Sequence, residues 1–184
     1  MSSMPGFKQD WPNIEAGICR LRPARQADLP ALHAAVTDPR FPPDLPLASM
    51  ARENQLAGWL ARLTTPDAAP RLWSVTGCDN DACIGQIGLL PIDNIDAHWV
   101  SYWLAPACWG RGMGGTALSF LADAALARPG YTRLIAAIAP DNRASIAVIH
   151  HAGFVAVSAP DIPAAGSLAC DTFERRGRIC GQIP

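Results

Sequence analysis

The glycine-rich stretch at residues 109–116 constrains this chain more than any other part of the sequence. Four of the six residues from Gly110 to Gly115 are glycine. The alternating residues 98–104 before the stretch predict a strand, and residues 115–127 predict a helix. Glycines let the backbone approach a ligand closely, and the first N–H groups of a helix are free to bind an anion. The stretch therefore predicts a loop that binds phosphate at a strand-to-helix turn.

A dinucleotide-binding loop is one alternative for this stretch. Gly110, Gly112 and Gly115 have the spacing of that fingerprint, and an acid, Asp141, follows the next predicted strand. Two features count against it: residues 105–109 separate the strand from the first glycine, and this strand is the third of a predicted meander. No Gly-Lys-Ser/Thr occurs, which excludes a Walker P-loop. A turn without a ligand is the other alternative, although each glycine costs up to about 1 kcal/mol of backbone entropy.

The hydrophobic pattern of the remaining chain predicts an α/β (α+β) protein. The predicted strands are residues 18–22, 71–76, 82–90, 97–104, 132–138, 154–158 and 168–175. The predicted helices are residues 27–36, a segment that begins at Ser49, residues 115–127 and residues 143–151. Short turns join the three consecutive strands in the middle, which predicts an antiparallel meander. The whole order predicts a mixed, mostly antiparallel central sheet with helices on both faces.

The segment between the first predicted helix and the meander has two parts. Four prolines within residues 38–46 remove backbone donors and fix φ, so we predict a rigid, exposed loop there. Ser49 is predicted to cap the helix that follows, and Thr65-Pro66 to end it. The apolar residues of that helix recur at helical spacing on one face, namely Leu56, Trp59, Leu60 and Leu63.

A chain of 184 residues is long enough for one domain with a two-layer core. We expect residues 1–16 to wrap the surface, residues 17–176 to form the core and residues 177–184 to form a tail. A formal net charge of −1 argues against a nucleic-acid partner, which requires a basic surface. The apolar runs are far shorter than the roughly 20 residues of a transmembrane helix, and residues 1–10 lack the apolar core of a signal peptide. We therefore expect a cytoplasmic monomer or homodimer that does not contact a membrane.

The six cysteines predict no metal site. None forms a C-x-x-C pair, and no histidine lies at ligand spacing from one. Cys78 and Cys83 flank a predicted turn, so a disulfide between them is one possibility. Reduced thiols are the rule in a cytoplasmic chain, and we expect them here.

Two further motifs follow the glycine stretch. Asn142-Arg143-Ala144-Ser145 opens the last predicted helix, and Gly153-Phe154 follows the end of that helix. Earlier matching motifs are Ile84-Gly85-x-Ile87-Gly88-Leu89 and Tyr102-Trp103-Leu104-Ala105-Pro106-x-x-Trp109-Gly110-Arg111-Gly112. In this order the motifs resemble the GNAT superfamily of N-acetyltransferases over residues 17–176. The resemblance is closest to the RimJ/RimL-like branch, which acetylates the N-terminal amines of ribosomal proteins.

The resemblance implies acetyl-CoA as the co-substrate. In the family, the loop before the helix binds pyrophosphate through backbone N–H groups, in a Gln/Arg-x-x-Gly-x-Gly/Ala pattern. Here Trp109 stands at the Gln/Arg position, while Gly112 and Gly114 fit the pattern. The implied acetyl-CoA-binding residues are Trp103, Leu104, Trp109, Gly110, Arg111, Gly112, Met113, Gly114, Gly115, Thr116, Asn142 and Ser145.

The same resemblance implies how the pantetheine arm is held. The strand that ends at Leu104 and the parallel strand from Thr132 are expected to splay apart. The backbone near Trp103 and Leu104 would then pair with pantetheine, and a strand N–H would polarise the thioester carbonyl.

Asn142 and Ser145 each have a structural and a functional interpretation. By residue type alone, Asn142 is the N-cap of its helix. In the family, the corresponding Asn bonds to pantetheine and the Ser lies near the thiol. Ser145 is therefore the predicted catalytic residue, whose hydroxyl donates to the departing thiolate. Many other members carry a Tyr as general acid four residues after that Ser, and Ile149 occupies this place here.

The sequence does not identify the general base. RimL-like relatives often carry a Glu in the strand before Tyr-Trp-Leu, where this chain has Trp99. The other candidates are His98, Asp96, Asp93, Tyr102, Glu53 and Asp44. Strand alternation places His98 on the face opposite Trp99.

We predict an acceptor pocket lined by Trp99, Glu53 and Asp44. The resemblance implies a primary-amine acceptor, with a peptide N-terminus first and a polyamine or aminoglycoside second. A non-catalytic homologue that binds acyl-CoA is the alternative to an enzyme.

Overall fold

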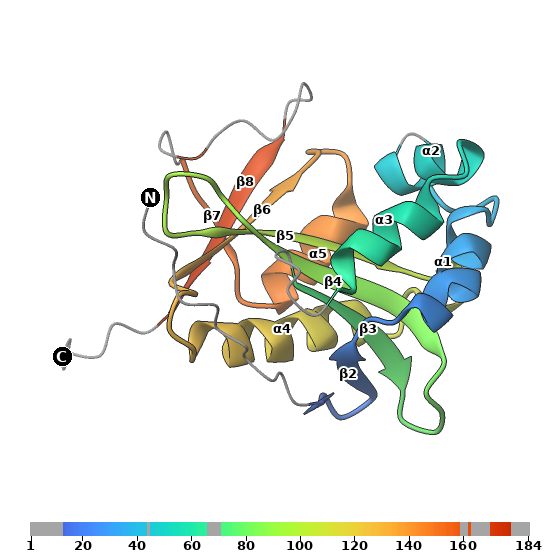
Figure 1. Ribbon diagram of the computed structural model, residues 1–184. Helices are drawn as coiled ribbons and strands as arrows, with labels where there is room; N and C mark the ends of the chain where they lie inside the picture. The colour runs from blue at the N-terminus through green and yellow to red at the C-terminus, as the bar shows by residue number, and fades with distance from the viewer. Residues whose placement is uncertain (1–12, 44, 66–70, 159–161, 163–169, 178–184) are drawn as a thin grey trace, which may run out of the picture.

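The computed structural model describes residues 13–43, 45–65, 71–158, 162 and 170–177 (Figure 1). Their strands form one eight-stranded sheet in the order β1-β2-β3-β4-β5-β6-β8-β7. The strands are β1 Ile14–Glu15, β2 Cys19–Pro23, β3 Arg71–Gly77, β4 Cys83–Pro91, β5 His98–Leu104, β6 Arg133–Ile138, β7 Val155–Ala156 and β8 Asp171–Arg176. The helices are η1 Gln26–Asp28, α1 Leu29–Val36, α2 Pro46–Arg52, α3 Leu56–Leu63, η2 Pro106–Cys108, α4 Met113–Leu126 and α5 Arg143–His151.

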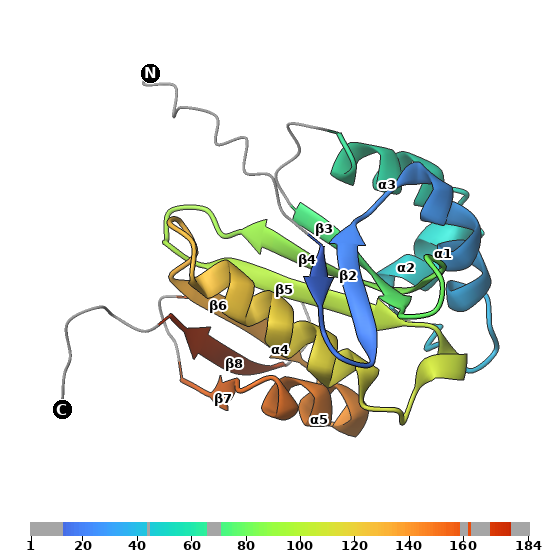
Figure 2. The same ribbon diagram turned by 90° about the horizontal axis from the view of Figure 1, so that it is seen from below.

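Helices cover both faces of the sheet. Helices α4 and α5 lie side by side on one face, and α1, α2 and α3 lie together on the other (Figure 2). Every strand pairing is antiparallel except that of β5 with β6. The prediction of a mixed, mostly antiparallel sheet between two helical layers is therefore confirmed.

The side chains of β5 show how the two layers are built. Val100 and Leu104 pack in the main core against α4 and α5, whereas Trp103 packs in a second core with α1, α2 and α3. Alternation along a strand sends neighbouring side chains to opposite faces, so one strand serves both cores. Fully buried members of the main core include Leu118, Leu121, Ile149 and Phe154.

The region predicted as one helix from Ser49 contains two helices. α2 already begins at Pro46, and Ser49 lies inside it. Proline is well suited to the first helical position, where an N–H has no partner in any case. Asn54 has a φ of 55° and separates α2 from α3. The predicted apolar face is correct for α3, because Leu56 and Leu60 are buried.

The prediction that the proline-rich loop at residues 38–46 is exposed is wrong at one residue. Phe41 is 5% exposed and packs in the second core. Its amide donates to the carbonyl of Asp38 over 2.9 Å, and the Asp38 carboxylate pairs with Arg40 over 2.8 Å. Local turn bonds thus direct one aromatic side chain inward and anchor the loop.

The two ends of the sheet differ from the prediction. Ala16 is fully buried and its amide donates to the carbonyl of Cys19, so residues 14–21 form a hairpin rather than a surface wrap. β7 has two residues, and β8 begins at Asp171. Residues 1–12 and 178–184, which hold the rest of the predicted wrapping segment and tail, lie outside the described residues.

The cysteines in the described part of the chain are free. Cys78 is exposed and its thiol donates to the carbonyl of Gly17 over 3.0 Å, whereas Cys83 is buried. These two residues therefore form no disulfide, and both are thiols, as expected. Cys180 lies outside the described residues.

A buried polar network crosses four strands beneath α1. Arg22 of β2 and Asp28 of η1 form two hydrogen bonds of 2.7 and 3.0 Å. Ser74 of β3 donates to Asp28 over 2.7 Å and accepts from Gln86 of β4 over 3.4 Å. The indole of Trp103 in β5 donates to the Gln86 side-chain oxygen over 3.2 Å. A continuous chain of hydrogen bonds therefore joins the start of α1 to β5.

We predict that Asp28 makes the stability of this fold pH-dependent. Burial acts to raise the pKa of Asp28, but hydrogen bonds from Arg22, Ser74 and the Arg25 amide lower it below its usual value. The stabilisation is therefore complete above the unfolded pKa of about 3.9 and is lost as the pH falls toward the folded value. Asp28→Asn removes one of the two carboxylates that pair with the buried Arg22, which keeps its pair with Asp81, and is expected to cost about 1–3 kcal/mol at pH 7.

Urea unfolding of the wild type and Asp28→Asn at pH 7 and pH 3 measures this effect. The difference in unfolding free energy should shrink at pH 3. Asp38→Asn is the matched control, because its ion pair with Arg40 is more exposed than that of Asp28 with Arg22, and a smaller change is expected. A difference that is equal at both pH values contradicts the prediction.

Candidate functional site

The glycine loop lies between η2 and α4 and presents free backbone amides. Gly110 and Gly112 have φ values of 72° and 73°, which favour glycine, and Gly112 is the N-cap of α4. A Cβ added to either would meet nothing within 4 Å, so the surrounding space is open. The first bond within the helix runs from the Thr116 amide to the Gly112 carbonyl. The amides before it, at the start of a 14-residue helix, are suited to an anion.

The other two glycines of the loop are required by packing, which the sequence did not separate from ligand binding. A Cβ on Gly114 would lie 3.0 Å from Leu104 Cδ1, and one on Gly115 would lie 2.7 Å from the ring of His151. The absence of side chains here lets the first turn of α4 approach β5 and α5. Gly114 and Gly115 thus set where the loop lies.

Trp109 ties the loop to the end of β5. Its indole donates to the carbonyl of Leu104 over 2.9 Å, while the ring itself is 45% exposed. Arg111 and Thr116 follow on the same turn, with Arg111 exposed and Thr116 half-buried. The residue that replaces the family's Gln or Arg therefore holds the loop rather than pointing a charge into it.

One edge of β5 has no strand neighbour beyond its first two residues. All seven residues of β5 pair with β4, but only His98 and Trp99 pair with β6. Among the described residues, no other strand pairs with the free edge at residues 100–104, which we call the open edge of β5. The expected splaying of the two parallel strands is confirmed. An extended ligand could add to this edge as a further strand.

The start of α5 lies across from this edge. The Asn142 side chain accepts the Ser145 amide over 3.0 Å, which confirms Asn142 as the N-cap of α5. The Tyr102 hydroxyl donates to the carbonyl of Ser145 over 3.1 Å and so joins β5 to α5. Burial raises the pKa of Tyr102 to about 12, against a smaller opposing effect of this hydrogen bond. Ile149 is fully buried in the main core.

Trp99 lies on the other face of the sheet. It is half-buried and packs against a small cluster formed by Ile92, Ala97 and Ile135. His98 points to the opposite face, as predicted, where its ring stacks on Tyr131 with centroids 4.4 Å apart. Burial lowers the pKa of His98.

The predicted carboxylates are dispersed. Glu53 is exposed at the end of α2 and accepts a hydrogen bond from Gln55 over 2.8 Å. Asp93 and Asp96 are exposed in the β4–β5 loop, and Asp44 lies outside the described residues. The structure thus does not gather these side chains around Trp99.

One acid near Trp99 was missed by the sequence analysis. Trp99 is in register with Ile135 of β6, and Ile135 is in register with Glu174 of β8. The Glu174 side chain therefore faces the same side of the sheet as Trp99, two strands away. Its carboxylate is 4% exposed and pairs with Arg133 over 2.8 Å and with Arg176. No local motif marks this acid, because only the pairing of distant strands brings it there.

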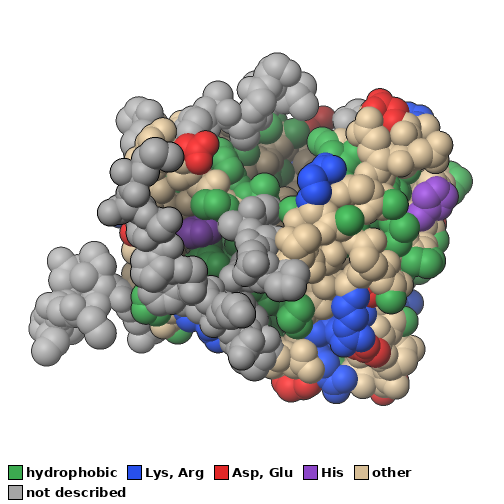
Figure 3. Space-filling model, in the orientation of Figure 1, with side chains coloured by type: hydrophobic (Ala, Val, Ile, Leu, Met, Phe, Trp, Pro, Cys, Tyr) green, Lys and Arg blue, Asp and Glu red, His purple; other side chains and the backbone are tan. Residues whose placement is uncertain are grey.

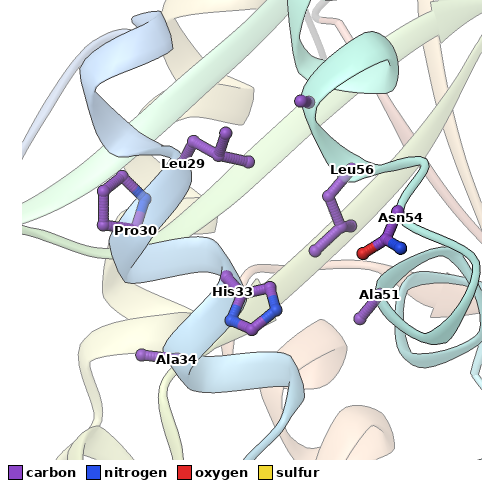
Figure 4. A pocket seen from close by; sticks show the side chains of 8 residues that line it. Leu29, Pro30, His33, Ala34, Ala51, Asn54 and Leu56 are labelled. Carbon is purple, nitrogen blue, oxygen red and sulfur yellow. The ribbon is translucent and has the colours of Figure 1, made fainter.

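A groove of about 570 Å³ lies between the helices of the second core. Leu29 and His33 of α1 line one side, facing Ala51, Asn54 and Leu56 across the groove (Figure 4). All its lining residues belong to the region from α1 to α3, so it is separate from the glycine loop. The space-filling view shows a second hollow with hydrophobic side chains between α2 and α3 and the strands β6 and β8 (Figure 3).

The fold places a glycine loop at the start of a helix, beside a strand edge that has no partner strand among the described residues. Residues 19–155 match the family described as the acetyltransferase (GNAT) domain. The chain therefore belongs to the GNAT acetyltransferase family. No curated protein matches the sequence.

Solved structures have the same fold at low identity. Mycobacterium smegmatis RimJ in complex with CoA-disulfide has a TM-score of 0.71 and 19% identity, and the match covers 98% of this chain and 93% of that one. RimL, the ribosomal L7/L12 α-N-protein acetyltransferase in complex with coenzyme A, has a TM-score of 0.65 and 19% identity, over 90% and 98% of the chains. A chimera of spermidine N-acetyltransferase SpeG from Vibrio cholerae and hSSAT has a TM-score of 0.68 and 17% identity, over 88% and 96%.

Two other features, a metal site and a membrane-spanning helix, are not found in the described part of the chain. It contains no group of three or more His, Cys, Asp or Glu side chains arranged to hold a metal ion. None of its helices has the length and apolar character needed to cross a membrane.

We predict that Gly112→Ala weakens binding of acetyl-CoA about ten-fold or more. The substitution strains a positive φ and places a methyl group where the phosphate would approach. Gly130→Ala is a matched control, because Gly130 also has a positive φ of 84° and open space around its Cβ but lies in the turn before β6.

Both variants should lose similar stability, and only Gly112→Ala should bind acetyl-CoA more weakly by isothermal titration calorimetry. Equal affinity in the two variants would show that the loop is a turn without a ligand.

Proposed function

We propose that this protein transfers an acetyl group from acetyl-CoA to a primary amine, which attacks the thioester directly. The observation that carries the proposal is the position of the glycine loop at the end of the open edge of β5. Amides suited to an anion thus lie beyond the end of an unpaired strand edge. Together, the loop and the edge suit a ligand with a pyrophosphate at one end and an extended, amide-containing arm.

The residues present fit acetyl-CoA. The amides from Gly110 to Gly115 would hold the pyrophosphate, and Arg111 is exposed beside them. The open edge of β5 would pair with the amides of the pantetheine arm near Trp103 and Leu104. Asn142, in addition to capping α5, and Ser145 would face the thiol end of this arm. Acetyl-CoA supplies the activated acyl group as a thioester.

The chain contributes electrostatic stabilisation to the transfer. A backbone N–H of β5 would polarise the thioester carbonyl as negative charge develops on its oxygen. The Ser145 hydroxyl would donate to the sulfur that leaves. Both groups belong to elements that are fixed by packing, which keeps them oriented before the reaction begins.

A peptide N-terminus is the acceptor that we favour. The fold similarity to RimJ and RimL supports it, and a hollow with hydrophobic side chains lies beside the sheet (Figure 3). The similarity to spermidine N-acetyltransferase makes a polyamine the second candidate. Trp99 offers area without charge on this face, which favours an acceptor with an apolar part over a polycation.

Proton removal from the acceptor ammonium would use water. Glu174 lies on the same face of the sheet as Trp99. Burial acts to raise the pKa of its carboxyl, but hydrogen bonds from Arg133 and Arg176 outweigh this effect and lower the pKa. It is therefore a weak base. Because this chain has Trp99 where RimL-like relatives often have a Glu, an ordered water would take the proton and pass it to solvent.

Turnover of acetyl-CoA with a panel of amines tests the proposal. The panel contains peptides with different N-terminal residues, spermidine and an aminoglycoside, and the release of CoA thiol is measured. We expect turnover with at least one peptide at a rate above that with spermidine. Binding of acetyl-CoA without turnover of any amine would support a non-catalytic homologue, and no binding would overturn the site itself.

We predict that Trp99→Glu raises kcat/KM for small N-terminal amines. The new carboxylate would stand at the position of the acid in RimL-like relatives, and this position is half-buried. Loss of the packing against Ile135 is expected to lower the melting temperature by several degrees. Trp99→Gln is the matched control, because it loses the same packing without gaining a base. Equal rates in the two variants would show that Trp99 has a packing role alone.

A further inference from the structure

The Tyr102 hydroxyl lies beside the proposed acetyl-CoA site and has no role in the reaction described above. It comes from β5, in the middle of the open edge, and donates to the Ser145 carbonyl over 3.1 Å. The phenol therefore reaches the first turn of α5, to which Ser145 belongs. Tyr102 of β5 and Ser145 of α5, which both carry a hydroxyl, are thus joined beside the open edge.

The thioester would lie beside Tyr102. The pyrophosphate site is beyond Leu104, so an arm that pairs with β5 runs from Leu104 back toward Trp99. Pairing between β5 and β6 closes the edge at Trp99. The reactive end of the arm must therefore stop beside residues 100–102, next to Tyr102.

The hydroxyl can turn toward this position. An O–H group rotates about its C–O bond, so a donor that bonds the Ser145 carbonyl can redirect its proton to a nearby anion. The ring is fixed by partial burial in the main core, which leaves little freedom except this rotation. Since burial raises the pKa of the phenol to about 12, it keeps its proton at neutral pH.

We propose that Tyr102 is a catalytic residue whose hydroxyl, together with that of Ser145, donates a hydrogen bond to the sulfur leaving the thioester. The inference rests on the proposed function. In the reaction, the C–N bond forms as the C–S bond breaks, and the electron pair of the latter remains on sulfur. The amine loses its proton to water, the thiolate takes a proton from water, and the phenol keeps its own throughout.

The first test compares Tyr102→Phe with Tyr131→Phe. These are the two tyrosines of the chain, and Tyr131 stacks on His98 away from Ser145. We expect Tyr102→Phe to lower kcat about 100-fold with a small change in the KM for acetyl-CoA, as for loss of one oxyanion donor. Tyr131→Phe is expected to retain the wild-type kcat.

Binding of CoA gives a readout that does not depend on turnover. Affinities for CoA and for desulfo-CoA, which lacks the sulfur, are measured at pH 7 and pH 9. In the wild type, CoA should gain affinity relative to desulfo-CoA at pH 9, where the thiolate forms. In Tyr102→Phe, the affinity for CoA relative to desulfo-CoA at pH 9 should be about ten-fold lower than in the wild type. An unchanged ratio together with an unchanged kcat overturns the inference.

A shape-preserving substitution covers the case in which Tyr102→Phe unfolds. In the Tyr131→Phe background, incorporation of 3-fluorotyrosine changes only Tyr102 and makes its phenol a stronger hydrogen-bond donor. The gain in CoA affinity at pH 9 should then increase, and an identical gain overturns the inference. Failure of the wild type to bind CoA would instead contradict the proposed function, so the two failures are distinguishable.

Discussion

The short pairing between β5 and β6 is the constraint on which the rest of the site depends. Two residue pairs, at His98 and Trp99, join the two halves of the sheet. If the pairing continued to Leu104, the backbone groups of residues 100–104 would be satisfied within the protein. Because it stops, these groups need water or a ligand. The open edge thus leaves backbone groups without a partner strand among the described residues, at the centre of an otherwise continuous sheet.

Packing on both faces fixes the geometry of this edge. On one face, Gly114 allows α4 to approach Leu104, and the Tyr102 hydroxyl bonds the first turn of α5. On the other face, the indole of Trp103 bonds Gln86 at the end of a network that begins at Asp28. Neighbouring residues of β5 are therefore held from opposite sides. A fixed strand can orient a thioester carbonyl without reorganisation during the reaction.

Local sequence signals predicted the order of elements, the glycine loop and the Asn142 cap, because each depends on nearby residues. They failed where distant parts of the chain meet. Glu174 faces the same side as Trp99 through the pairing of β6 with β8, and Tyr102 reaches Ser145 across the open edge. The split between α2 and α3 at Asn54 was missed because this residue adopts a positive φ, which no glycine or proline marks in the sequence. The sequence treats the glycines of the loop as one group, but the packing of Gly115 depends on a side chain far along the chain, that of His151.

Amide hydrogen exchange in the presence and absence of CoA tests the central claim most directly. The claim is that the open edge of β5 and the start of α4 bind one ligand together. It predicts that CoA slows exchange at both residues 100–104 and residues 110–116, while amides around the groove between α1 and α3 are unaffected. Protection confined to the groove, or slowed exchange at the glycine loop without any at β5, would contradict the account.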